Sequence, residues 1–212
     1  MSSIGETPGV QEAAGGTAEA PRGESLPFAR WEGPVAVVSD ASRISEGLRL
    51  LRGEPVLGFD TETRPSFRRG EAYPPALVQL AGKEVVVLFQ LGRVGLPDGL
   101  KALLADPAVV KAGVAVGRDV KELVDFSPFE PRGFVDLAEM AEAAGLKARG
   151  LRGLAEEVLG LKVAKGQRTT NWAKHDLTPA QVAYAATDAY LGRALYLALR
   201  ARLSRRQETE AY

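Results

Sequence analysis

Residues 56–89 read VLGFDTETRPSFRRGEAYPPALVQLAGKEVVVLF, and this stretch decides the fold. It holds three short apolar runs, which are Val56–Asp60, Ala76–Ala81 and Val85–Phe89. Apolar runs of this length, rich in β-branched residues and bounded by polar segments, are typical of β-strands. Only Gly-Lys-Glu separates the last two runs, a spacing that favours a hairpin. We therefore expect three adjacent antiparallel strands.

Strand and helix patterns alternate outside this stretch. Further strands are predicted at residues 35–39 and 109–116. The spacing of apolar residues predicts helices at 44–51, 96–104, 120–124, 137–144, 151–159 and from Thr178 onward. Since a β-α-β alternation joins strands in parallel, the later strands should extend the sheet in parallel. The predicted fold class is α/β: a mixed sheet of three antiparallel strands and then parallel strands, flanked by helices.

Composition narrows the class of protein. The chain has 212 residues, 45% of them hydrophobic, with 27 basic and 27 acidic side chains and no cysteine. This length and composition favour one globular domain. The lack of cysteine excludes disulfides, thiolate metal sites and cysteine nucleophiles, and makes the cytoplasm the expected location. No apolar run is long enough to span a bilayer, so no membrane association is expected.

The two ends of the chain differ from the middle. Residues 1–25 are rich in Gly, Ala, Ser and Glu and contain few large apolar residues, so we expect a disordered tail. The predicted domain comprises residues 26–206, and residues 207–212 are expected to form a short C-terminal tail.

Five polar side chains stand where strands end or on helix faces. Asp60 and Glu62 are two residues apart in a predicted strand and therefore point to the same side. Tyr184 and Asp188, four residues apart in a helical pattern, share one helix face. Asp119 follows the strand predicted at 109–116. Small neighbours would let the last helix approach the sheet closely: Ala183, Ala185, Ala186 and Ala189.

Carboxylates gathered from separate segments are the ligands that Mg²⁺ and Mn²⁺ prefer. The chain has a single histidine and no cysteine, which disfavours zinc. Each motif alone also has a structural explanation: a solvated strand end for Asp60 and Glu62, a helix start for Asp119, and a Tyr–Asp hydrogen bond within a helix for the last pair.

Other acidic and histidine side chains are secondary candidates. Asp136 is expected to cap a helix, and Asp125 is a weaker alternative to Asp119 as a ligand. His175 lies in a loop-like Lys-His-Asp-Leu segment and is interpreted as a surface or packing residue.

Taken in order, the motifs resemble a known family. The matching stretches are FDTET (residues 59–63), the strands at 76–89, GVAVGRDVKEL (113–123) and NWAKHDLTPAQVAYAATDAY (171–190). They resemble the DEDD superfamily of 3′-5′ exonucleases in its tyrosine branch, and look most like the exonuclease domains of ribonuclease D and the Werner-syndrome protein. The resemblance extends over residues 33–204.

This resemblance implies a ribonuclease-H-like fold and a metal-dependent 3′-5′ exonuclease. Asp60, Glu62, Asp119 and Asp188 would bind two divalent ions, Mg²⁺ or Mn²⁺, and Tyr184 would lie beside the attacking water. The substrate would be DNA or RNA with a free 3′ end, hydrolysed to nucleoside 5′-monophosphates. The alternative is a catalytically inactive nucleic-acid-binding or scaffolding module of the same fold.

Substrate contacts are expected in two segments. Residues 147–174 contain seven basic and two acidic side chains, which favours either phosphate binding or simple solubility. By the resemblance, Lys165 and Arg168 should face the substrate. Trp172 should either stack on a base or anchor the loop in the core. Thr63, which closes the first motif, is also expected at the substrate.

Overall fold

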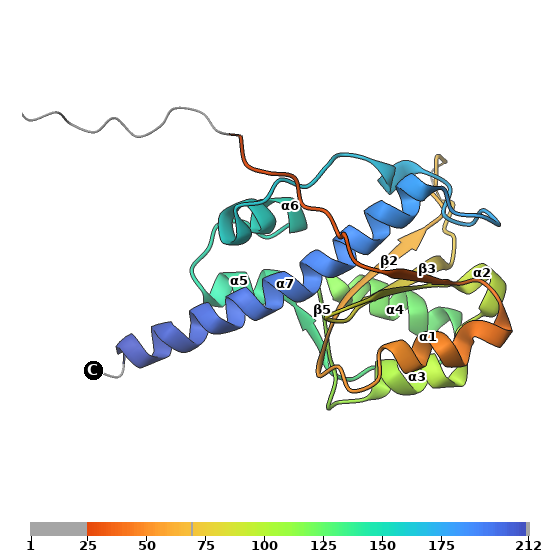
Figure 1. Cartoon of the computed structure of the whole chain (residues 1–212), viewed down its shortest axis with the longest axis horizontal. Helices are drawn as coiled ribbons and strands as arrows, with labels where there is room; N and C mark the ends of the chain where they lie inside the picture. Colours follow the sequence, from red (N-terminus) through yellow and green to blue (C-terminus); the bar gives the residue numbers. More distant parts are fainter. Residues whose placement is uncertain (1–24, 69, 211–212) are drawn as a thin grey trace, which may run out of the picture.

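The computed structural model describes residues 25–68 and 70–210, and its centre is a six-stranded sheet (Figure 1). The strand order is β1-β4-β3-β2-β5-β6. The strands are β1 (Val35–Val38), β2 (Val56–Thr63), β3 (Pro75–Ala81), β4 (Val86–Gln90), β5 (Val110–Gly113) and β6 (Phe134–Asp136).

The pairing confirms the predicted mixed sheet. Strand β3 pairs antiparallel with both β2 and β4, whereas β1, β5 and β6 join their neighbours in parallel. Strand β6 was not predicted, because its three residues are too few to show a period. The strand expected at 109–116 ends earlier, at Gly113. The chain turns at Ala115, which has a left-handed φ of 58°, and a helix begins at Val116.

Helices cover both faces of this sheet (Figure 1). One face packs against α1, α3 and α4, and α7 lies across the opposite face with α5 and α6 beside it. The helices are α1 (Ile44–Leu50), α2 (Leu91–Val94), α3 (Asp98–Ala105), α4 (Val116–Phe126), α5 (Leu137–Ala143), α6 (Leu151–Leu154) and α7 (Pro179–Glu210), with short 3-10 turns at Ala41–Arg43 and Gln167–Thr169 and a π-turn at Ala155–Leu159.

The alternation of side chains along β2 determines which residues face α7. Leu57 and Phe59 point into the core beneath α1, α3 and α4. Val56 belongs to the core on the other face, and a side chain at Gly58 would meet α7. Because the period of a strand is two residues, the next side chains on the α7 face are those of Asp60 and Glu62.

Helix α7 makes a close backbone contact with the sheet. A Cβ atom at Gly58 would lie 1.8 Å from the carbonyl oxygen of Ala189, and one at Gly192 would lie 2.6 Å from the carbonyl oxygen of Ala112. Three of the four alanines expected to allow this approach are fully buried, whereas Ala183 is exposed. Only residues without a bulky side chain fit at this crossing.

The start of α7 is set by a capping box. The Thr178 hydroxyl accepts a hydrogen bond from the Gln181 backbone N–H at 3.2 Å, and the Gln181 side-chain oxygen accepts one from the Thr178 N–H at 3.0 Å. Pro179 follows at the first helical position, where its missing N–H costs nothing. The helix continues to Glu210, beyond the expected boundary at 206, and no glycine or proline follows Gly192 within it. Of the predicted tail at 1–25, residues 1–24 lie outside the described residues.

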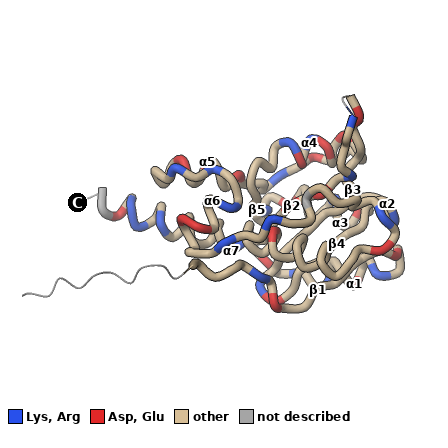
Figure 2. The backbone as a smooth tube through the Cα atoms, turned by 90° about the horizontal axis from the view of Figure 1, so that it is seen from above, with Lys and Arg blue, Asp and Glu red and all other residues tan. Residues whose placement is uncertain are grey.

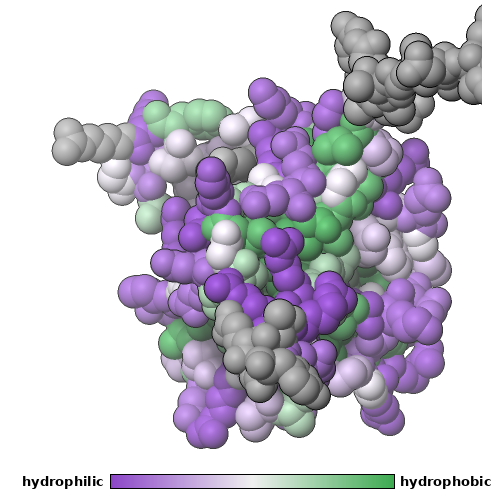
Figure 3. Space-filling model, turned by 90° about the vertical axis from the view of Figure 1, so that its left-hand side faces the viewer, coloured by the Kyte–Doolittle hydropathy of each residue, from purple (hydrophilic) through white to green (hydrophobic). Residues whose placement is uncertain are grey.

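Basic residues gather toward the C-terminal end of α7 (Figure 2). Arg193 donates a hydrogen bond to the carbonyl of Val56 at 3.1 Å and pairs with Glu54 at 3.6 Å. The surface seen from the end that carries α5 and α6 is mostly hydrophilic, with apolar residues visible in its central part (Figure 3). Within the described residues, no helix is both long and apolar enough to cross a bilayer.

Candidate active site

Three carboxylates meet where β2 passes under α7. Oxygen atoms of Asp60, Glu62 and Asp188 all lie within 4.8 Å of one another. Two of these residues come from the end of β2, and Asp188 comes from α7, one turn before the close contact at Gly192. The backbone contact between helix and strand therefore fixes the separation of the three side chains.

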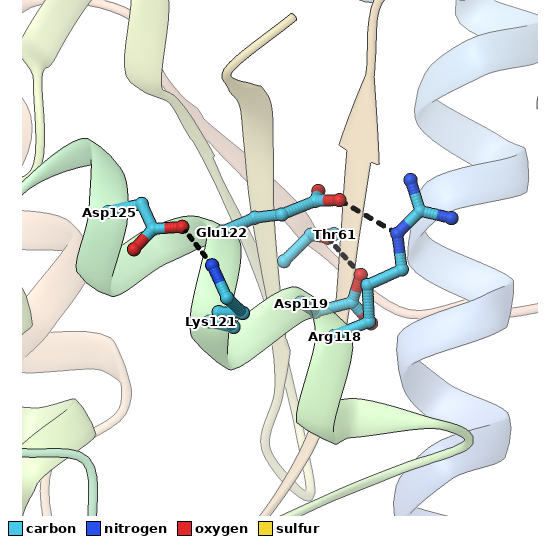
Figure 4. Close-up of polar contacts among 6 residues, drawn as sticks. All are labelled: Thr61, Arg118, Asp119, Lys121, Glu122 and Asp125. Carbon is cyan, nitrogen blue, oxygen red and sulfur yellow. Dashed lines mark hydrogen bonds and ion pairs between the residues drawn. The ribbon is translucent and has the colours of Figure 1, made fainter. Parts of the chain in front are cut away.

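Asp119 reaches the same cleft from the other side of the sheet. It lies in the first turn of α4, and its Oδ1 atom accepts a hydrogen bond from the Thr61 hydroxyl at 2.9 Å (Figure 4). Thr61 points away from its neighbours Asp60 and Glu62, because strand side chains alternate. Asp119 is thus held beside the three-carboxylate cluster but is not within it. No motif or spacing in the sequence indicates that Thr61 positions Asp119.

The cleft makes ionisation of these carboxylates costly. Burial raises the pKa of Asp188 to about 6 and the pKa of Asp119 to about 6. The pKa of Asp60 is also raised, first by burial and then by the charges of Asp188 and Asp119. The Asp188 Oδ1 atom is buried and has no hydrogen-bond partner among the described residues. Hard oxygen donors with raised pKa values and an unpartnered buried oxygen fit divalent cations.

Tyr184 stands one helical turn before Asp188 and is half-buried. Its hydroxyl lies close enough to the Asp188 carboxylate for each group to shift the pKa of the other. Burial, followed by the charge of Asp188, raises the pKa of the phenol above its ordinary value of 10. Tyr184 therefore stays protonated at neutral pH and is available as a hydrogen-bond donor.

All five of these residues line one cleft of about 500 Å³. Gly150–Gly153 at the start of α6 form part of its wall, and Arg152 in this segment is exposed. The charge of Arg152 acts on Asp188 and lowers its pKa, though less than burial raises it. Arg152 is one of seven basic residues between 147 and 174, and no pattern in the sequence distinguishes it from the others.

The four expected substrate contacts differ in their placement. Lys165 is exposed in the loop that precedes the 3-10 turn at 167–169. The backbone of Arg168 is in that turn, but its side chain lies outside the described part of the chain. Thr63 is half-buried at the end of β2 and is not among the residues that line the cleft.

Trp172 occupies the core. Its side chain is 1% exposed and packs beside Tyr184, with ring centroids 6.1 Å apart. A base cannot stack on a ring whose faces are already covered. The structure therefore favours the alternative in which Trp172 anchors the loop and supports Tyr184.

The secondary candidates lie elsewhere. Asp125 is on the outer face of α4 and pairs with Lys121 at 2.5 Å (Figure 4). Asp136 caps α5 as expected, accepting a hydrogen bond from the Ala138 N–H at 2.9 Å. His175 is exposed and lies 2.9 Å from the Asp176 carboxylate, as expected for a surface residue.

Comparison with known proteins agrees with this geometry. A family model described as 3′-5′ exonuclease matches residues 35–204. The bifunctional 3′-5′ exonuclease/ATP-dependent helicase WRN of Mus musculus is 35% identical over 184 residues, which is 82% of this chain and 13% of that protein. Ribonuclease D of Haemophilus influenzae is 33% identical over 174 residues, which is 80% of this chain and 42% of that protein. The chain thus spans less than half the length of these curated relatives.

Solved structures show the same fold. The Nibbler EXO domain of Aedes aegypti has a TM-score of 0.73 at 23% identity, covering 87% of this chain and 94% of that one. Ribonuclease D of Escherichia coli has a TM-score of 0.70 at 24% identity, covering 80% of this chain and 45% of that one. Ribonuclease D of Trypanosoma brucei, solved in complex with RNA U12, has a TM-score of 0.70 at 23% identity and covers 79% of this chain and 63% of that one. These likenesses confirm the predicted ribonuclease-H-like fold.

Proposed function

Because the chain belongs to the family of 3′-5′ exonuclease domains, we propose that it removes nucleotides one at a time from the free 3′ end of a nucleic acid. The products would be nucleoside 5′-monophosphates. The observation that carries the proposal is the meeting of Asp60, Glu62 and Asp188 within 4.8 Å, with Tyr184 one helical turn from Asp188.

The carboxylates would hold two divalent ions, Mg²⁺ or Mn²⁺. Asp60, Glu62 and Asp188 would share one ion, and Asp119 would contribute to the second. When bound, the ions would supply Lewis-acid activation of the attacking water and would stabilise the leaving 3′ oxygen. The raised pKa values of the carboxyl groups support this assignment, because a cation relieves the cost of ionising them in the cleft.

Tyr184 would orient the attacking water. Its raised pKa makes it a poor base at neutral pH, so its contribution is a directed hydrogen bond. The nearby charge of Asp188 further disfavours loss of the phenol proton. Arg152, an exposed cation on the wall of the same cleft, is suited to bind a phosphate oxygen of the substrate.

The proposed substrate class is DNA or RNA with a free 3′ end. The carboxylates would act on the scissile phosphate, which both nucleic acids share, so the preference would depend on contacts to the sugar. The cytoplasmic location expected from the sequence stays a prediction.

The test is a time course with 5′-labelled single-stranded and recessed-end DNA and RNA, in Mg²⁺ or Mn²⁺. We expect a ladder of products that differ by one nucleotide, absent with chelator and in Asp60→Asn. The matched control is Asp125→Asn, which changes an exposed aspartate on the outer face of α4 and should leave the ladder intact. Binding without a ladder on any substrate would instead support the inactive-module alternative.

A further inference from the structure

A second groove adjoins the catalytic cleft on the far side of Tyr184. It has a volume of about 470 Å³ and shares Val163, Tyr184 and Asp188 with the cleft. Its other walls are residues 163–167, the N-terminal part of α7, and the segment 25–33, which we call the N-terminal strap. The two hollows therefore meet at these shared residues.

Hydrogen bonds fix the strap against the rest of the domain. The Ala29 N–H donates to the carbonyl of Lys162 at 2.7 Å, and the Lys162 N–H donates to the carbonyl of Pro27 at 2.8 Å. Farther along, the Trp31 N–H donates to the Thr187 hydroxyl of α7 at 3.2 Å. The strap is thus tied both to the loop before the groove and to the helix beneath it.

Phe28 lies between these tethers, at the edge of the groove. Its side chain is 65% exposed, although its backbone forms a parallel bridge with Lys162. Because the backbone is already paired, only the side-chain rotation of the ring has to be ordered when a flat partner covers it. Ala180 and Ala183 of α7 line the same groove, and their small side chains leave space in it.

Charged side chains also line the rim of this groove. Arg30 and Lys165 are exposed and line the groove, together with one exposed acidic residue, Glu32. An aromatic platform flanked by cations is the arrangement that single-stranded nucleic acids bind, since bases stack on the ring and phosphates pair with the cations.

We propose that this groove is a base-binding subsite for the single-stranded end of the substrate, in which Phe28 stacks on one base. Arg30 and Lys165 bind the neighbouring phosphates. The proposal rests on the proposed exonuclease function, because the groove meets the cleft at Tyr184 and Asp188. The stacked base belongs to a nucleotide close to the scissile phosphate.

The test pairs a protein change with the removal of a single base. Labelled single-stranded oligonucleotides are bound to the Asp60→Asn protein, with or without Phe28→Ala, and their affinity is measured by fluorescence anisotropy. Phe28→Ala should weaken binding of the intact oligonucleotide roughly five- to hundredfold. In a series with one abasic site at successive positions from the 3′ end, this loss should disappear at the position whose base stacks on Phe28.

Three further variants separate stacking from structure. Phe28→Trp should bind as tightly as the parent, whereas Phe28→Leu, which keeps apolar volume without an aromatic face, should bind as weakly as Phe28→Ala. Phe126→Ala removes another exposed phenylalanine, on α4 and outside both hollows, and should change nothing. Equal affinity of Phe28→Ala and the parent would overturn the proposal, as would a loss that persists at every abasic position.

Hydrolysis by the wild-type protein on the same oligonucleotides is measured separately. A ladder together with no effect of Phe28→Ala on affinity would overturn the subsite and leave the exonuclease function standing. Binding that depends on Phe28 and on one base, without any ladder, would support the subsite and overturn the exonuclease function.

Discussion

Asp188 should lower the stability of the metal-free protein while serving its activity. Burial raises its pKa from 3.8 to about 6. A carboxyl group with a raised folded-state pKa contributes stability that is fully present below the unfolded pKa and is lost as the pH rises through the folded one. The shift of about two units corresponds to roughly 3 kcal/mol at neutral pH, at about 1.4 kcal/mol per unit.

Asp188→Asn removes this cost and keeps the shape of the side chain. In chelator at pH 7.5 we expect the free energy of unfolding to rise by about 2–3 kcal/mol, with a gain that shrinks as the pH falls toward about 4. The same variant should lose at least roughly a hundredfold in kcat, because a neutral amide is a poor ligand for a divalent cation. Urea titrations between pH 5 and 7.5, evaluated by linear extrapolation, and initial hydrolysis rates measure the two effects.

The control is Asp125→Asn, which removes an exposed carboxylate paired with Lys121. An exposed ion pair of this kind contributes less than about 1 kcal/mol, so stability should change little and activity not at all. The reasoning would be refuted if Asp188→Asn were no more stable than the parent in chelator at pH 7.5. A gain that did not vary with pH would also refute it.

Further substitutions test other contacts. Gly58→Ala would place a Cβ atom 1.8 Å from a backbone oxygen of α7 and should lower the free energy of unfolding in urea by about 3 kcal/mol or more. The matched change Gly117→Ala meets no described atom within 4 Å and should raise the free energy of unfolding by about 0.5–1 kcal/mol. Tyr184→Phe should lower kcat roughly ten- to hundredfold with KM nearly constant, and an unchanged kcat would exclude a role in orienting water. Lys165→Gln should reduce the slope of log affinity against log salt by about 0.7, and an equal slope would show that Lys165 contacts no phosphate.

The parts of the fold that the sequence predicted are those with a strong local period. Strand β2 begins with the uncharged run Val-Leu-Gly-Phe, and β3 and β4 are mostly apolar. A short hairpin joins β3 and β4, so their pairing follows from neighbouring residues. Strand β6 has three half-buried residues and no period to detect. The end of β5 was misplaced because Val114 and Val116 continue the apolar run, although the backbone turns at Ala115.

The site residues that the sequence predicted are those whose chemistry and whose spacing in a strand or helix both indicate a shared site. Asp60, Glu62 and Asp188 stand at spacings that place them on a strand face and a helix face, and α7 brings them together. Phe28 had no such signal, because its partner Lys162 lies far along the chain and one isolated bridge leaves no pattern in the sequence. Arg152 was one of seven basic residues in its segment, and only the tertiary structure distinguishes the one that lines the cleft.

The crossing of α7 over β2 explains why buried like charges persist here. Asp60 and Asp188 repel each other and are both desolvated, so a flexible connection would let them separate. Their backbones cannot move apart easily, since Gly58 and Ala189 pack in direct contact a few residues away. The burial of Ala185, Ala186 and Ala189 against the sheet therefore offsets the electrostatic cost at the helix face that holds Asp188. It follows that a substitution loosening this crossing should impair metal binding even when every carboxylate is intact.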